Sequence, residues 1–181
     1  MDFIDLGRQY ELIKDKVDSG IRSVIDSRHF IMGPEIAELE KRLAQFVGRK
    51  YCLTCGSGTE ALQIPLMAYG LQKTDAVFVP SFTFFASAES VNLIGATPVF
   101  VDIDPDTFNI DPSKIEEAIT PKTKAIIPVH LYGQPCDMDP IMEIAKRHNL
   151  YVIEDCCQAI GAEYKGKKVG TFGDVGCYSL L

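Results

Sequence analysis

The chain has 181 residues, enough for one ordinary domain, and its 46% hydrophobic and 24% charged residues are the balance of a globular protein rather than a disordered one. Its 18 Lys and Arg against 25 Asp and Glu give a net charge of −7, which argues against a protein that coats nucleic acid. The first five residues carry early acids instead of the basic and then apolar run of a signal peptide, and no apolar stretch approaches the ~20 residues of a membrane helix. We therefore expect a cytoplasmic protein without a membrane partner, whose six cysteines are reduced, small buried side chains and not metal ligands.

The first 48 residues are expected to be helical. Apolar residues recur at helical spacing from Leu12 to Ile25, and residues 32–34, with the sequence Met-Gly-Pro, interrupt that pattern. A second helix follows, with apolar residues on one face and charged residues on the other, and Gly48 is a natural stop for it.

Beyond residue 50, short apolar runs alternate with helical patterns. Strands are expected at 51–54, 76–79, 97–103, 125–129, 151–153 and 175–180. Helices are expected after Thr59 to about residue 68, at 112–119 and at 140–148, a further helix is expected to end at 91–94, and a hairpin turn is expected at 165–168. This alternation predicts an α/β fold with three layers (α/β/α) and a mostly parallel, mixed sheet buried on both faces. The sequence ends inside or just past the last strand, so we expect the domain to be cut short.

Ligands of such sheets bind at the carboxyl ends of the strands, where two segments suggest an anionic, ring-shaped ligand. Residues 56–59 form a glycine-rich turn into a helix, which suits a phosphate, although simple helix capping by Thr59 explains the pattern equally well. The loop at 80–85 carries Phe84, which could stack on a planar ring or anchor the loop in the core.

Two further segments follow strands and carry ionisable side chains. Asp155, at the end of an apolar strand, needs a positive partner such as a protonated ring nitrogen or a salt bridge, and Gln158 could reach the same ligand. His130 is either a catalytic group or a structural histidine. A phosphate cradle, a stacking ring and a carboxylate at one sheet edge are what pyridoxal 5'-phosphate (PLP) requires, because the carboxylate keeps the pyridine nitrogen protonated.

Several segments, in order along the whole chain, resemble the DegT/DnrJ/EryC1/StrS family, which consists of sugar aminotransferases of PLP fold type I. The resemblance rests on residues 56–62 (GSGTEAL), 80–84 (PSFTF), 95–104 (GATPVFVDID), 123–133 (TKAIIPVHLYG), 154–159 (EDCCQA) and 170–174 (GTFGD).

The resemblance implies a role for each candidate residue. Gly58 and Thr59, helped by Ser179, would hold the cofactor phosphate, and Phe84 would stack on the pyridine ring. Asp155 would pair with the ring nitrogen, and Gln158 would lie near the ring hydroxyl. We take Asp155 and His130 as the catalytic candidates.

The resemblance also implies what lies outside this sequence. The family places its Schiff-base lysine a few residues beyond Ser179, and the sequence ends at Leu181. We therefore expect residues 1–181 to comprise an N-terminal helical segment and most of the PLP-binding large domain, without the small C-terminal domain. The family is usually homodimeric, and its usual amino donor is glutamate.

The expected function is amination of a nucleotide-linked keto-sugar in amino-sugar or surface-polysaccharide synthesis. Two alternatives stay open. A sugar 3-dehydratase of the same superfamily has histidine in place of the lysine, and residues 154–157 are similar to that branch. The other alternative is a non-catalytic binding fragment, which only the missing lysine supports. Because of the missing lysine, we also expect residues 1–181 alone to be inactive.

Overall fold

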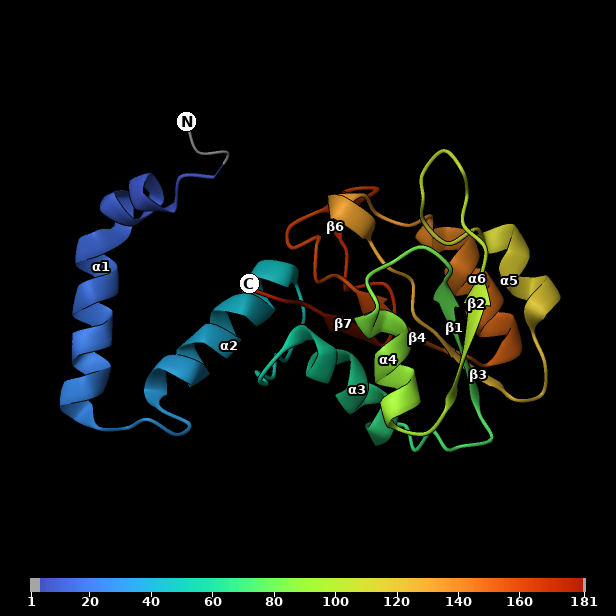
Figure 1. Ribbon diagram of the computed structural model, residues 1–181, viewed down its shortest axis with the longest axis horizontal. Helices are drawn as coiled ribbons and strands as arrows, with labels where there is room; N and C mark the ends of the chain where they lie inside the picture. Colours follow the sequence, from blue (N-terminus) through green and yellow to red (C-terminus); the bar gives the residue numbers. More distant parts are fainter. Residues whose placement is uncertain (1–3, 181) are drawn as a thin grey trace. The chain divides into compact units, whose positions relative to one another are not determined.

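The computed structural model describes residues 4–180, and the chain divides into two compact units, Met1–Arg42 and Leu43–Leu181 (Figure 1). None of the helices between residues 4 and 180 combines the length and the apolar character needed to cross a bilayer.

The first unit contains α1 (Leu6–Ser27) and most of α2 (Pro34–Val47), which confirms the two helices expected there. Asp5 caps α1, since its carboxylate accepts the amide of Arg8 at 2.9 Å. Pro34 opens α2 at the break that residues 32–34 predicted, because a proline is tolerated where a helix begins and lacks amide partners.

The second unit is built around a five-stranded sheet in which every strand pair is parallel, in the order β2-β1-β3-β4-β7 (Figure 1). Its strands are β1 (Ala76–Pro80), β2 (Thr97–Val101), β3 (Thr123–Ile126), β4 (Tyr151–Asp155) and β7 (Val175–Cys177). A separate antiparallel pair is formed by β5 (Glu163–Tyr164) and β6 (Lys167–Lys168), and an isolated antiparallel bridge joins Ile103 and Ile110. Lys165 and Gly166 between β5 and β6 have φ of 50° and 78°, which confirms the expected hairpin turn.

Helices cover both faces of this sheet, so the expected three-layer arrangement is confirmed. One face packs against α3 (Gly58–Ala68) and α4 (Ala86–Leu93), and the other against α5 (Pro112–Ala118) and α6 (Met138–His148). A short 3-10 helix, η1 (Leu131–Gly133), follows β3.

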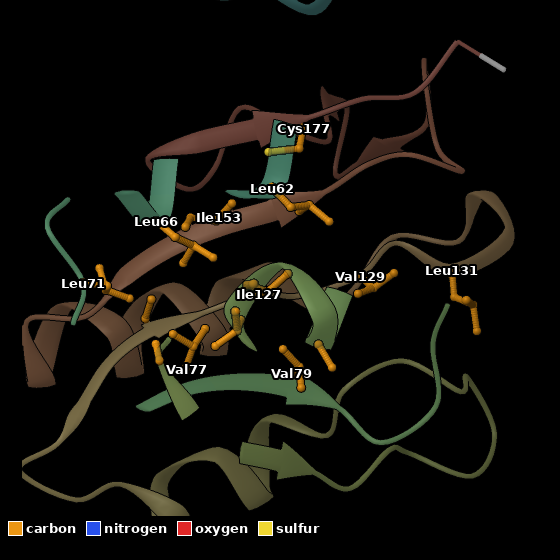
Figure 2. Close-up of a cluster of buried hydrophobic side chains, with 14 residues drawn as sticks. Leu62, Leu66, Leu71, Val77, Val79, Ile127, Val129, Leu131, Ile153 and Cys177 are labelled. Carbon is orange, nitrogen blue, oxygen red and sulfur yellow. The ribbon is translucent and has the colours of Figure 1, made fainter. Parts of the chain in front are cut away.

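Side chains alternate between the two faces along each strand. Val77 and Val79 pack with Leu66 of α3, whereas Phe78 between them packs with Ile141 of α6. Figure 2 shows the first of these clusters, which reaches from Leu71 across the strands to Val129. Burial on both faces explains why β1 (AVFVP) is apolar at every position.

The structure corrects the expected strand at 51–54. This segment is in no strand, and Tyr51 and Leu53 are 74% and 85% exposed. An apolar run becomes a strand only where a neighbouring strand supplies hydrogen bonds, and no strand within residues 4–180 pairs with it. The strand expected at 125–129 begins earlier, at Thr123, and ends at Ile126, before Pro128, which has no amide to donate.

Candidate functional site

Asp155 lies at the carboxyl end of β4, between the ends of β3 and β7. Its amide donates to the carbonyl of Pro128 at 2.9 Å, and its carbonyl accepts the amide of His130 at 3.0 Å. On its other side it pairs in register with Cys177 of β7. The backbone of Asp155 is therefore fixed from both neighbouring segments.

The Asp155 carboxylate is only 6% exposed and accepts one hydrogen bond on each oxygen. Ser87 Oγ, from α4, donates to Oδ2 at 2.9 Å, and the amide of Cys157 donates to Oδ1 at 3.1 Å. A carboxylate oxygen has two lone pairs, so each oxygen can accept one further donor. A protonated ring nitrogen is a donor of the required kind.

The start of α3 leaves backbone amides without acceptors. Ser57 is the N-cap, and its Oγ accepts the amide of Glu60 at 3.2 Å, while the Glu60 carboxylate accepts the amide of Gly56 at 2.8 Å. The amides of Gly58 and Thr59 find no acceptor within residues 4–180. Free amides at the positive end of an 11-residue helix suit an anion such as a phosphate.

Gly58 and Ser179 are adjacent in space although they lie far apart in the sequence. A Cβ built on Gly58 would lie 3.1 Å from Cβ of Ser179 and 2.9 Å from Sγ of Cys157. Only glycine fits at this approach, and Oγ of the half-buried Ser179 lies 3.6 Å from the same Cβ position. The structure thus brings together Gly58, Ser179 and the turn that follows Asp155.

Phe84 and Gln158 are exposed at the same edge. The Phe84 side chain is 70% exposed, so it does not anchor its loop in the core, and that interpretation is wrong. Gln158 Oε1 accepts the amide of Tyr132 at 2.9 Å, which ties it to the turn after His130.

The ring of His130 lies on the face of the sheet opposite the Asp155 carboxylate. Its Nε2 lies 3.1 Å from Oε2 of Glu154, and successive residues of a strand, such as Glu154 and Asp155, point to opposite faces. The amide of Cys136 donates to Nδ1 at 3.0 Å, so the proton of the neutral ring is on Nε2 and is donated to Glu154. Both ring nitrogens are therefore engaged inside the protein.

Glu154 is fully buried and accepts three backbone amides in addition to the histidine. The amides of Gly170, Phe172 and Gly173 donate to it at 2.6, 2.7 and 2.6 Å. Burial alone would raise the pKa of Glu154, but the hydrogen bonds from His130 and these amides outweigh it and lower the pKa below its ordinary value.

Ligand atoms of His130, Glu154 and Cys156 lie within 4.8 Å of one another, the spacing of a metal site. Their chemistry does not suit one, because the histidine and the carboxylate are already engaged in the hydrogen bonds described above. Burial and the charges of Glu154 and Asp155 raise the pKa of the Cys156 thiol, which keeps it protonated and a poor ligand.

A cavity of about 630 Å³ lies at the opposite, amino-terminal edge of the sheet, where Tyr69, Lys124 and Tyr151 contribute to its lining. None of the candidate residues lines it. The candidate site is an open surface at the carboxyl edge, with Phe84 and Gln158 projecting from it.

Sequence reasoning missed Ser87, which contacts the candidate carboxylate directly. The available signal was the pair of hydroxyl residues Thr83 and Ser87, one in the loop before α4 and one in its first turn, whose Oγ atoms lie 3.1 Å apart.

Comparison with known proteins decides the family. A family model described as the DegT/DnrJ/EryC1/StrS aminotransferase family matches residues 11–180. The chain belongs to the DegT/DnrJ/EryC1/StrS aminotransferase family. A Pseudomonas aeruginosa member, UDP-2-acetamido-2-deoxy-3-oxo-D-glucuronate aminotransferase, is 54% identical over all of this chain and 50% of its own length.

Solved structures share the fold of this family member. A DegT/DnrJ/EryC1/StrS aminotransferase from Brucella abortus aligns with a TM-score of 0.91 at 44% identity, over 98% of this chain and 50% of that one. A Bacillus subtilis protein solved with bound cofactor PMP aligns with a TM-score of 0.89 at 40% identity, over 97% and 40%. The chain spans about half the length of the curated relatives that it matches.

Proposed function

We propose that the chain is the cofactor-binding part of a PLP-dependent aminotransferase that acts on a nucleotide-linked keto-sugar. The observation that carries this proposal is that Cys157 links the Asp155 carboxylate to the start of α3. Its amide donates to Asp155 Oδ1, and its Sγ lies 2.9 Å from a Cβ built on Gly58. The name of the Pseudomonas aeruginosa relative, which specifies a UDP-linked 3-oxo sugar, supports the substrate class.

The residues present fit the cofactor. The Gly58 and Thr59 amides and the Ser179 hydroxyl would hold its phosphate, because the missing Cβ at Gly58 lets the start of α3 approach Ser179. Phe84 would stack on one face of the ring, because its side chain is exposed beside this edge. When bound, the cofactor supplies an electron sink for chemistry at the carbon that carries the amino group.

Asp155 would hold a proton on the ring nitrogen, because a carboxylate with a free lone pair on each oxygen favours a charged donor. Gln158 would lie near the ring hydroxyl, held through its contact with Tyr132. His130 would act as a positioning residue, because its ring is on the far face and supports Glu154 beside Asp155.

The remaining parts of the proposal rest on the family resemblance and on the fraction of the relatives' length that this chain covers. Residues 1–181 would form the N-terminal helical segment and most of the large domain, and the other half of the family's length would supply the small domain. Glutamate would be the amino donor, a homodimer the working assembly and the cytoplasm the location, with amino-sugar or surface-polysaccharide synthesis as the role.

Titration of the purified chain with PLP tests the cofactor site. We expect saturable binding, measured by equilibrium dialysis, and an increase in Kd of about tenfold or more for Asp155→Asn, because a hydrogen bond to a charged group is lost. Asp139→Asn, on α6 across the sheet, is the matched control and should leave Kd unchanged. No binding to the wild-type chain would favour a fragment without the cofactor, and equal binding by Asp155→Asn would remove Asp155 from the site.

The reaction itself is tested with a protein that has these residues and the full length of the family's members. Incubation with a UDP-linked 3-oxo sugar and glutamate should give an amino sugar, and Asp155→Asn should abolish turnover. A dehydrated sugar without incorporated nitrogen would instead identify the dehydratase alternative.

A further inference from the structure

Ser87 connects two parts of the candidate site that the sequence keeps apart. Its backbone amide donates to the carbonyl of Phe84 at 3.2 Å, and its side-chain hydroxyl donates to Asp155 Oδ2 at 2.9 Å. Ser87 is 1% exposed, so both contacts are shielded from water.

The hydroxyl of Thr83 extends this contact into a chain with a defined direction. Thr83 Oγ1 and Ser87 Oγ lie 3.1 Å apart. Because the single hydroxyl proton of Ser87 is donated to Asp155, the proton between the two hydroxyls comes from Thr83. Hydrogen bonds that point the same way along a chain strengthen one another.

Ser90 shows what a buried serine of α4 does when it has no such task. It is as buried as Ser87, and its Oγ donates to the backbone carbonyl of Ser87 at 3.1 Å, the usual back-bond of a helical serine. Ser87 instead directs its hydroxyl out of its own helix to a carboxylate 68 residues further along the chain.

We propose that Ser87 is a positioning residue that fixes Asp155 and the loop carrying Phe84 to each other, so that the carboxylate and the aromatic ring form one preset site. The cofactor-related part of this inference rests on the proposed function. The mechanical part, the coupling of the two segments, belongs to the cofactor-free chain and is testable in it.

Amide hydrogen exchange of the cofactor-free chain measures the coupling. In Ser87→Ala we expect exchange to become about tenfold faster in segments 81–87 and 155–158, because the hydrogen bond that joins them is lost while the backbone contacts stay. Thr83→Val keeps the shape of the side chain and should loosen only segment 81–87, since Ser87 still donates to Asp155. Ser90→Ala removes a side-chain hydrogen bond to the carbonyl of Ser87 but none to Asp155, so as the matched control it should leave segment 155–158 unchanged.

Binding of PLP gives the second readout. Ser87→Ala should raise the Kd for PLP about tenfold. The double variant Ser87→Ala and Phe84→Ala should raise Kd by less than the product of the two single increases, because loss of Ser87 has already loosened Phe84. Strictly multiplicative effects, or unchanged exchange at 155–158 in Ser87→Ala, would overturn the proposal. If the wild-type chain binds no PLP, the proposed function fails while the exchange data still decide the coupling.

Discussion

His130 Nε2 and Glu154 Oε2 lie 3.1 Å apart in the interior, where neither side chain has any exposed surface. The same carboxylate accepts backbone amides from residues 170–173, and Arg49 donates to carbonyls of that segment, with Nε at 3.0 Å from the oxygen of Gly170. The segment that leads into β7 is thus held between a carboxylate and a guanidinium.

The tautomer of His130 is the first prediction. Because Nδ1 accepts the Cys136 amide, nitrogen NMR of the imidazole should show a proton on Nε2 and none on Nδ1. His29 and His148 provide comparison signals from outside the interior. A proton on Nδ1 would contradict the arrangement of Glu154 and His130.

The second prediction concerns Glu154→Gln. The side-chain NH2 group of glutamine would face the backbone N–H groups and the His130 N–H that now donate to the carboxylate. Because these donors would lose an acceptor, the free energy of unfolding should fall by about 3 kcal/mol. Urea unfolding measures the loss, with the exposed Glu117→Gln on α5 as the control.

The stabilities of the wild type and of Glu154→Gln should depend differently on pH. The pKa of Glu154 in the folded chain lies below its ordinary value of 4.5, so its contribution to stability is present above that pH and is lost as the pH falls through the folded value. The stability difference between wild type and Glu154→Gln should therefore shrink below about pH 4.5. A difference that stays constant down to pH 3 would argue against an ionised Glu154.

The third prediction is that Gly58 does not tolerate a side chain. Gly58→Ala puts a Cβ against Cys157 and Ser179, and this overpacking should cost about 1–3 kcal/mol of stability and weaken PLP binding. Gly20→Ala is the control, because Gly20 lies inside α1 with nothing within 4 Å of the new atom and alanine favours a helix by about 1 kcal/mol. Equal stability of Gly58→Ala and wild type would mean that the start of α3 is not so close to Ser179.

The fourth prediction concerns thiol reactivity. The expectation that all six cysteines are buried is wrong for Cys55, which is exposed. Burial raises the pKa of the Cys136, Cys156 and Cys177 thiols, so iodoacetamide at pH 8 should label Cys55 first and these three only after unfolding. Mass spectrometry of the labelled peptides gives the order, and early labelling of Cys136 would contradict the packing around it.

The sequence predicted the layers correctly because parallel strands and their helices leave strong patterns, as in the all-apolar run of β1. It misassigned residues 51–54 because an apolar run does not reveal whether a pairing neighbour exists. It could not place the His130 ring, since the turn after β3 decides which face the side chain reaches. Ser87 was missed because its importance depends on a contact with Asp155, which only the fold creates.

The order of strands in the sheet has a consequence for synthesis on the ribosome. β1 and β2 emerge first and pair with each other, which leaves one side of β1 with unpaired backbone groups. β3 then joins β1, β4 joins β3, and β7 joins β4, so every later strand meets a partner that has already emerged. The sheet can grow in one direction as the chain lengthens, without reopening any pair that it has already made.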